Sequence, residues 1–237
     1  MKMHLLCDGF FTLDKSLVVY MKYMGQPYEA ALKPLLILTD SGEKILVDTG
    51  AGKLPESLEK FFPVKRKTHE TLEVQLRKHG LKPDDIDIVV NTHLHFDHCG
   101  NNKLFKSARF IVQKAELQYA YEPEKFMQTA YVREFFDVKG LNYETVRGDC
   151  RVCEDVHLIS TFGHTIGHQS VVVKGNDGKN LVYCGDAAPI RENLERRNVP
   201  GILYNTHEAL KSIDKLRGIE NAVYIYSHDN EQLAIQL

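Results

Sequence analysis

Cysteine is scarce in this sequence, and long apolar runs are missing from it. The 237 residues include five cysteines, an odd and low number, so we expect no disulfide framework and a reducing compartment. Nowhere do about 18 or more apolar residues follow one another, as a membrane-spanning helix requires. The short apolar run Leu5–Cys7 is interrupted by Asp8 and Gly9, and no small-residue cleavage pattern follows it, so no secretory signal is expected. These absences predict a cytoplasmic protein.

An excess of charge of one sign is also missing. Thirty Lys and Arg residues stand against 32 Asp and Glu residues, which gives a formal net charge of −2. This balance offers no electrostatic reason to expect nucleic acid or a membrane as a partner. The length fits one large α/β domain spanning residues 1–237, and no linker or fixed-period repeat divides it. We therefore expect a small-molecule partner, and we predict no oligomeric state.

The apolar pattern predicts strands arranged in hairpins and interleaved with a few helices. Strands are predicted at residues 4–7, 17–23, 35–39, 45–47, 86–90, 110–112, 156–160, 170–173, 181–184 and 222–226, and helices at 68–79, 115–136 and 206–216. Hairpin turns are predicted at 41–44 and 176–179. Asn205 and Glu208 are predicted to form a capping box at the start of the last helix. This order suggests two mixed sheets between outer helices, although periodicity alone does not fix the arrangement.

Four potential metal ligands crowd into one short segment that directly follows a predicted buried strand. They are His93, His95, Asp97 and His98. Imidazole and carboxylate are ligands that Zn²⁺ favours. His93 and His95 should project to the same side of an extended segment, as two ligands of one ion must. Asp97 and His98 then turn toward a neighbouring position, which suggests a second ion. A polar surface loop would explain one histidine, but hardly four ligands at this spacing.

Three further candidate ligands each follow a predicted strand: His164, Asp186 and His228. Strand ends are where α/β folds build their sites, so these residues could complete two metal sites. Gly163 should permit a close approach of backbone and metal next to His164. Taken singly, each residue could instead be a capping Asp or a solvent-facing His.

These segments resemble those of the metallo-β-lactamase superfamily, and most of all the N-acyl homoserine lactone lactonases within it. The segments that carry the resemblance, which extends along nearly the whole chain, are 45–50 (ILVDTG), 92–100 (THLHFDHCG), 163–170 (GHTIGHQS), 185–187 (GDA) and 227–229 (SHD). The resemblance implies an α/β fold, an αββα sandwich of two mixed sheets flanked by helices, with the metals at one edge.

The resemblance also implies a role for each candidate residue. His93, His95 and His164 would bind one ion, Asp97, His98 and His228 would bind the other, and Asp186 would bridge the two. Two divalent ions, zinc by preference, would provide a metal-bridging hydroxide that opens a lactone or ester. Asp97 could pass a proton to the leaving group. Asp48, and also His168, would orient the ligand rings from behind.

One position departs from the lactonase pattern. Three residues after Asp186 the lactonases would carry a Tyr directed at the lactone, but Pro189 stands here. Proline has no hydrogen-bond donor, so that contact is lost. Tyr204 is the nearest candidate substitute as a catalytic residue. We therefore expect modest lactone hydrolysis with broad tolerance of acyl or alkyl groups, and acyl homoserine lactones are a narrower prediction than lactones in general.

Other functions remain open at this point. A glyoxalase-II-like thioester hydrolase would share the seven ligands but usually has an added C-terminal helical region. A promiscuous β-lactamase-type hydrolase would normally need a secretory signal. A metal-binding sensing module would not need a complete set of ligands. The pair Cys150 and Cys153 has no second pair at zinc-ribbon spacing, so we expect it to be incidental.

Overall fold

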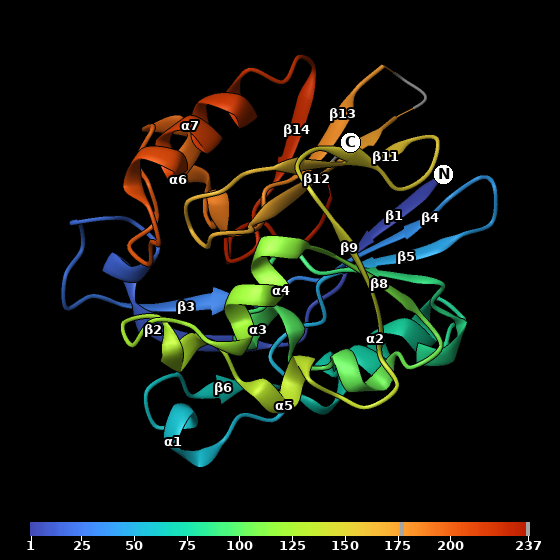
Figure 1. Cartoon of the computed structure of the whole chain (residues 1–237), viewed down its shortest axis with the longest axis horizontal. Coiled ribbons are helices and arrows are strands. Elements are labelled where there is room, and N and C mark those ends of the chain that lie inside the picture. Colours follow the sequence, from blue (N-terminus) through green and yellow to red (C-terminus); the bar gives the residue numbers. More distant parts are fainter. Residues whose placement is uncertain (176–177, 236–237) are drawn as a thin grey trace.

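The computed structural model describes residues 1–175 and 178–235, and it has two mixed sheets face to face between outer helices (Figure 1). The first sheet has the order β1 (Lys2–Leu5), β4 (Leu35–Leu38), β5 (Lys44–Val47), β7 (Ile88–Val90), β8 (Arg109–Gln113) and β9 (Asn142–Val146). The second has the order β10 (Cys150–Arg151), β11 (Val156–Ser160), β12 (Gln169–Lys174), β13 (Asn180–Tyr183) and β14 (Ala222–Ile225). The predicted αββα sandwich is confirmed.

A third, smaller sheet and seven α-helices complete the described chain. The small sheet joins β3 (Pro27–Ala31), β2 (Phe10–Asp14) and β6 (Val64–Lys65). The helices are α1 (Glu56–Glu59), α2 (Leu72–Lys78), α3 (Phe96–Cys99), α4 (Lys114–Tyr121), α5 (Arg133–Phe136), α6 (Arg191–Glu195) and α7 (Thr206–Arg217). Within the described ranges, no helix is long and apolar enough to cross a membrane.

The direction of the strands brings their carboxyl ends together. β5 and β7 are parallel neighbours in the first sheet, and β13 and β14 are parallel neighbours in the second. Parallel neighbours end at the same edge of a sheet, where α/β folds place their binding sites. The segments that follow these four strands contain the candidate residues Asp48, His93, Asp186 and His228.

Three apolar layers hold the sandwich together. Side chains of both sheets, including Ile45, Val90 and Val171, fill the space between them and are fully buried. Leu76 of α2 packs on the outer face of the first sheet, and Ile213 of α7 packs on the outer face of the second. Burial of each such side chain contributes roughly 1.5–3 kcal/mol.

Helix α7 begins where the sequence predicted, and its start is tied to the site. The Asn205 side chain accepts hydrogen bonds from the backbone N–H groups of His207 and Glu208, at 3.0 and 3.1 Å. The backbone N–H of Asn205 donates to the Gly163 carbonyl at 2.9 Å, and Glu208 pairs with Lys211 at 2.9 Å. The predicted N-cap is therefore confirmed, but Glu208 does not complete a capping box, and α7 anchors the loop next to His164.

Two of the predicted elements are wrong. Residues 17–23 form turns and the end of a short 3₁₀ helix, Lys15–Leu17, instead of a strand. Met21 and Tyr23 have φ values of 57° and 56°, which a strand does not allow. The predicted helix 115–136 is broken, because α4 ends at Tyr121, just before Pro123, which cannot continue it. The predicted turn at 176–179 includes two residues, 176 and 177, that lie outside the described chain.

Asp8 gives a testable dependence of stability on pH. This carboxylate is buried and accepts a hydrogen bond from Arg66 at 2.7 Å. Burial raises its pKa from 3.8 to about 6, and the positive charge of Arg66 only partly opposes this shift. The folded protein therefore binds a proton more tightly than the unfolded chain does. The stabilising contribution is full below pH about 4 and is lost as the pH rises through about 6.

We expect Asp8→Asn to weaken this trend. Between pH 4 and 7 the wild type should lose up to about 3 kcal/mol of unfolding free energy through this group, and the variant should not lose that part. Urea unfolding at several pH values measures the difference, with the exposed Asp84→Asn as a control. Parallel pH curves for the wild type and Asp8→Asn would contradict the expectation.

Candidate metal centre

The segment 93–98 leaves β7 in an extended conformation and then turns into a short helix. Leu94 is fully buried, while the rings of His93 and His95 lie side by side with their centroids 4.5 Å apart. His95 is the residue before helix α3, and the backbone N–H of His98 donates to its carbonyl at 3.0 Å. This turn redirects Asp97 and His98 to a second position. The predicted geometry of the motif is thus found in the structure.

Two glycines allow the other candidate ligands to approach. Gly163 has a φ of 128°, and a Cβ there would lie 2.2 Å from the backbone nitrogen of Ala209 in α7. Gly163 therefore allows its loop to pack directly against α7. Gly185 has a φ of 55°, and a Cβ there would lie 2.6 Å from Nε2 of His168. Any larger residue would collide with α7 at Gly163 and with the His168 ring at Gly185.

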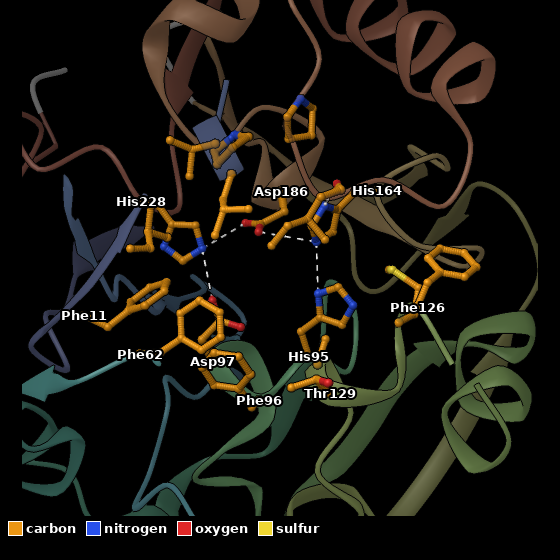
Figure 2. A pocket seen from close by; sticks show the side chains of 18 residues that line it. Phe11, Phe62, His95, Phe96, Asp97, Phe126, Thr129, His164, Asp186 and His228 are labelled. Carbon is orange, nitrogen blue, oxygen red and sulfur yellow. Dashed lines mark hydrogen bonds and ion pairs between the residues drawn. The ribbon is translucent and has the colours of Figure 1, made fainter. Parts of the chain in front are cut away.

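The seven candidate ligands meet in two adjoining groups, and all of them are nearly or fully buried. The ligand atoms within each group lie within 4.8 Å of one another. The three-histidine group is His93, His95 and His164, and the four-residue group is Asp97, His98, Asp186 and His228. Figure 2 shows five of these side chains around one cavity.

Asp186 faces both groups. Its Oδ1 lies 3.3 Å from Nε2 of His98 and 3.3 Å from Nε2 of His228, in the four-residue group. Its Oδ2 lies 3.5 Å from Nε2 of His164, in the three-histidine group. One carboxylate with an oxygen directed at each group is the arrangement that a bridging ligand requires.

The spacing of the ring nitrogens fits a metal ion. Nε2 of His164 lies 3.1 Å from Nδ1 of His95, and Nε2 of His98 lies 3.2 Å from Nε2 of His228. Nitrogens bound to one tetrahedral ion at 2.0–2.1 Å would be about 3.3 Å apart. Nε2 of His93 is buried and has no hydrogen-bond partner among the described residues. Buried polar atoms of this kind need a partner, and a bound cation would provide one.

Protein oxygens fix three of the rings from behind. Nδ1 lies 2.8 Å from an Asp48 carboxylate oxygen in His98, 2.9 Å from the Ile202 carbonyl in His164, and 2.8 Å from the Ala31 carbonyl in His228. A proton on each Nδ1 leaves the lone pair of Nε2 directed inward.

Asp48 and His168 also hold the loops of the site. Asp48 accepts hydrogen bonds from the backbone N–H and the hydroxyl of Thr92, both at 2.8 Å. Nε2 of His168 accepts the backbone N–H of Asp186 at 2.9 Å. These contacts agree with the supporting positions that the sequence analysis gave to both residues.

The two groups differ in charge. Burial, together with the neighbouring His98, lowers the pKa of His93 well below its ordinary value, and burial with His164 does the same for His95. In the four-residue group burial also opposes protonation, but the carboxylates of Asp186 and Asp97 together outweigh it and raise the pKa of His228 to about 9. The three-histidine group therefore presents neutral imidazoles, the form that binds metals. A cation entering the four-residue group would displace protons.

The centre opens into an apolar cavity. Besides candidate ligands, the cavity is lined mainly by apolar side chains. Phe11, Phe62 and Phe96 lie together on one side of it (Figure 2), and Pro189 and Ile202 also belong to the lining. Since proline has no donor, Pro189 leaves this part of the wall without a hydrogen-bonding group. Sequence reasoning missed Phe11 and Phe62, because only the small third sheet and the loop after α1 bring them here.

Tyr204 is the one predicted site residue that belongs, within the described part of the chain, neither to a ligand group nor to the cavity lining. Its ring packs edge-on against Tyr119 at 5.4 Å, and its backbone N–H bonds to the loop of His164. The position of this ring does not support a catalytic role for Tyr204.

We accordingly expect Tyr204→Phe to leave lactone turnover within about twofold of the wild type, as is usual for a change that removes no active-site donor. Steady-state kinetics and metal content measure this. A fall of about tenfold or more with unchanged metal content would mean that Tyr204 moves into the cavity during turnover.

Cys150 and Cys153 lie far from this cavity in the fold. Both are free thiols on and after the edge strand β10, and they pack partly against the core between the sheets. Neither belongs to a group of potential metal ligands among the residues described. That the pair is incidental stays a prediction.

An αββα sandwich with buried histidines and carboxylates gathered at its strand ends is an architecture of metal-dependent hydrolases. Comparison with protein families gives the particular class. The model of the metallo-β-lactamase superfamily matches residues 35–228, and the chain belongs to this superfamily. The resemblance noted in the sequence is therefore confirmed.

Individual relatives agree with this assignment. An N-acyl homoserine lactonase from Rhizobium radiobacter, AttM, is 31% identical over 89% of this chain and 86% of its own length. N-acyl homoserine lactonase AiiA from Bacillus thuringiensis subsp. kurstaki is 30% identical over 98% of this chain and 94% of its own. A crystal structure of a B. thuringiensis AiiA variant with N-decanoyl-L-homoserine bound at the active site superposes with a TM-score of 0.85, at 30% identity over 98% and 94% of the two chains.

Proposed function

We propose that this protein is a hydrolase that opens the ester bond of lactones with two divalent metal ions. The observation that carries the proposal is Asp186, whose two oxygens face two separate groups of ligands at the wall of an apolar cavity. The similarity to proteins named N-acyl homoserine lactonases, over nearly the whole chain, supports lactones as the substrate class.

The three-histidine group would hold one ion, the four-residue group would hold the other, and Asp186 would bridge them. When bound, such ions supply a nucleophile derived from water at neutral pH and polarise a carbonyl group. Zinc is the metal that we expect, because imidazole and carboxylate suit it, although other divalent ions accept the same ligands. The hydrogen bonds of Asp48, Ile202 and Ala31 keep the ligand rings oriented without further reorganisation.

The cavity would bind the apolar part of the substrate. One side of it is formed by Phe11, Phe62 and Phe96. Phe126 also lines the cavity, and its side chain is 66% exposed. Apolar contacts have no preferred direction, so acyl or alkyl groups of several lengths should be accepted. N-acyl homoserine lactones are among the substrates that we propose, together with simpler lactones and esters.

Asp97 would hand a proton to the departing oxygen of the opened ring. It lines the cavity, and its Oδ2 lies 3.3 Å from Nε2 of His228. The His98 and His228 imidazoles keep the pKa of Asp97 below its usual range despite burial, so its carboxylate is ionised. The proton that it hands on would have to come from the water-derived nucleophile. Pro189 provides no donor, and loss of one preorganised donor can cost about 10²–10³ in rate. We therefore propose measurable but modest lactone turnover.

A side-by-side substrate panel tests this function. Purified zinc-loaded protein would be assayed with acyl homoserine lactones of different chain length, alkyl lactones, a thioester, a β-lactam and a phosphodiester. We expect ring opening of several lactones with little dependence on acyl length. Strong hydrolysis of the thioester or β-lactam with no turnover of any lactone would contradict the proposal. Metal binding without turnover of any substrate would favour a sensing module.

A further inference from the structure

A buried carboxylate outside the seven candidate ligands lies directly behind the centre. Glu116, on the first turn of α4, has no exposed surface. Within the described part of the chain, no Lys, Arg or His side chain forms an ion pair with it. Burial of a charge without an opposite charge costs several kcal/mol unless hydrogen bonds compensate for it. The groups that provide these bonds show what Glu116 holds in place.

Both oxygens of Glu116 accept hydrogen bonds from the loops of the three-histidine group. Oε1 accepts the backbone N–H of Leu94, which lies between His93 and His95, at 3.0 Å. Oε2 accepts the backbone N–H of Gly167, in the loop that contains His164, also at 3.0 Å. One side chain therefore joins two loops that are about 70 residues apart in the sequence.

Gly167 lies unusually close to α4. A Cβ on Gly167 would be 2.4 Å from the backbone nitrogen of Glu116 and 2.5 Å from its Cβ. Only a glycine permits this approach, so the loop of His164 rests directly on the helix start. The contact keeps the backbone N–H of Gly167 within hydrogen-bonding distance of Glu116.

A third hydrogen bond extends the same support to a ligand ring. Oε1 of Glu116 also accepts the hydroxyl of Tyr131 at 3.0 Å. The Tyr131 ring packs edge-on against His95, with centroids 4.8 Å apart and an interplanar angle of 76°. Glu116 thus fixes Tyr131, and Tyr131 limits the rotation of the His95 imidazole.

We propose that Glu116 is a positioning residue that brings His93, His95 and His164 together before a metal ion binds. The inference rests on the proposed function, since it takes these histidines as metal ligands. The four-residue group has other supports: Asp48 holds His98, Ala31 holds His228, and Ser227 bonds to Asp186 at 2.6 Å. Loss of the Glu116 carboxylate should therefore weaken one metal site and leave the other unchanged.

The test is a competition between a chelator and the protein for Zn²⁺ alone, which yields the affinity of each site. In Glu116→Gln the side chain keeps its size, but its NH₂ group cannot accept one of the backbone N–H groups. We expect the affinity of one site to fall about 10–100-fold, as for other residues that orient metal ligands. Histidine ring NMR of the protein with and without zinc identifies this site as that of His93, His95 and His164.

Two further variants make the test specific. Tyr131→Phe keeps the ring on His95 but removes one donor to Glu116, so it should weaken the same site by a smaller factor, about threefold. It carries the test if Glu116→Gln does not fold, and affinities equal to the wild type would then overturn the proposal. Glu70→Gln changes another buried glutamate, which accepts the backbone N–H of Lys67 at 2.7 Å and belongs to neither ligand group nor the described cavity lining, so both affinities should stay unchanged.

The outcomes separate this inference from the proposed function. Wild-type protein that binds two zinc ions, together with equal affinities in wild type and Glu116→Gln, would overturn the positioning role alone. Equal weakening of both sites in Glu116→Gln would also overturn it, because it would indicate general loosening of the fold. Wild-type protein that fails to bind two ions would overturn both the proposed function and the role of Glu116.

Discussion

Asp186→Ala should lose both metal binding and hydrolysis, because this carboxylate directs one oxygen at each group of ligands. Without it, His98 and His228 lose their shared anionic neighbour. Two ions bound in the two groups would also lose the carboxylate that they would share. We expect the metal content to fall from about two ions per chain to less than one. Lactone turnover should fall by about 10³-fold or more, beyond the loss of a single active-site donor.

Ser227→Ala provides the matched control for that variant. Its hydroxyl donates to Oδ1 of Asp186 at 2.6 Å and to the Gly185 carbonyl at 3.1 Å. The alanine variant keeps the carboxylate but loses this support, so we expect a loss in metal affinity of about tenfold. Elemental analysis after dialysis and steady-state kinetics give both quantities. If Asp186→Ala behaved no worse than Ser227→Ala, Asp186 would not be the bridging ligand.

The second large effect is expected at Asp97. Asparagine retains an oxygen that can contact a metal but cannot carry a proton. For lactones and alkyl esters, whose alkoxide must be protonated as it leaves, Asp97→Asn should lower kcat by about 10²–10⁴-fold. A phenyl ester, whose leaving group is stable as an anion, should be affected much less.

This contrast between leaving groups separates proton transfer from metal binding. The comparison is valid if the variant still holds the wild-type amount of metal, which elemental analysis establishes. With metal retained, an equal fall for alkyl and phenyl esters would show that Asp97 does not deliver the proton. Its role would then be that of a ligand alone.

The metal-binding segments could be predicted from sequence because each depends on local patterns. His93 and His95 alternate with Leu94 directly after an apolar strand, and this alternation already directs both imidazoles to one side. Asp186 and His228 follow strands that are parallel neighbours in the second sheet. The convergence of parallel strand ends is a general property of such sheets, so no detail of side-chain packing was needed.

The predictions failed where tertiary packing determines the local conformation. The apolar residues 17–23 suggested a strand. In the structure Leu17 and Val18 line the cavity instead, so these side chains are apolar because they form part of its wall. The helix 115–136 was predicted from the spacing of its apolar residues, without enough regard for Pro123. In the structure α4 ends just before this proline. Tyr204 is near His164 through its backbone only, and the direction of a ring cannot be read from distance along a chain.

Glu116 shows a further limit of sequence patterns. It lies in an amphipathic helix, where a glutamate is ordinarily assigned to the solvent-facing side. Its burial follows from contacts with Leu94, Tyr131 and Gly167, which come from three distant segments. Only the assembled fold places these donors around one carboxylate.

The central claim is that the seven residues hold two metal ions at once. The most direct measurement is a titration of metal-free protein with zinc, monitored by isothermal titration calorimetry. Elemental analysis after dialysis then counts the ions that stay bound. The account predicts about two ions per chain, with lactone turnover reaching its maximum only when the second ion has bound. Full turnover with one tightly bound ion per chain would contradict it.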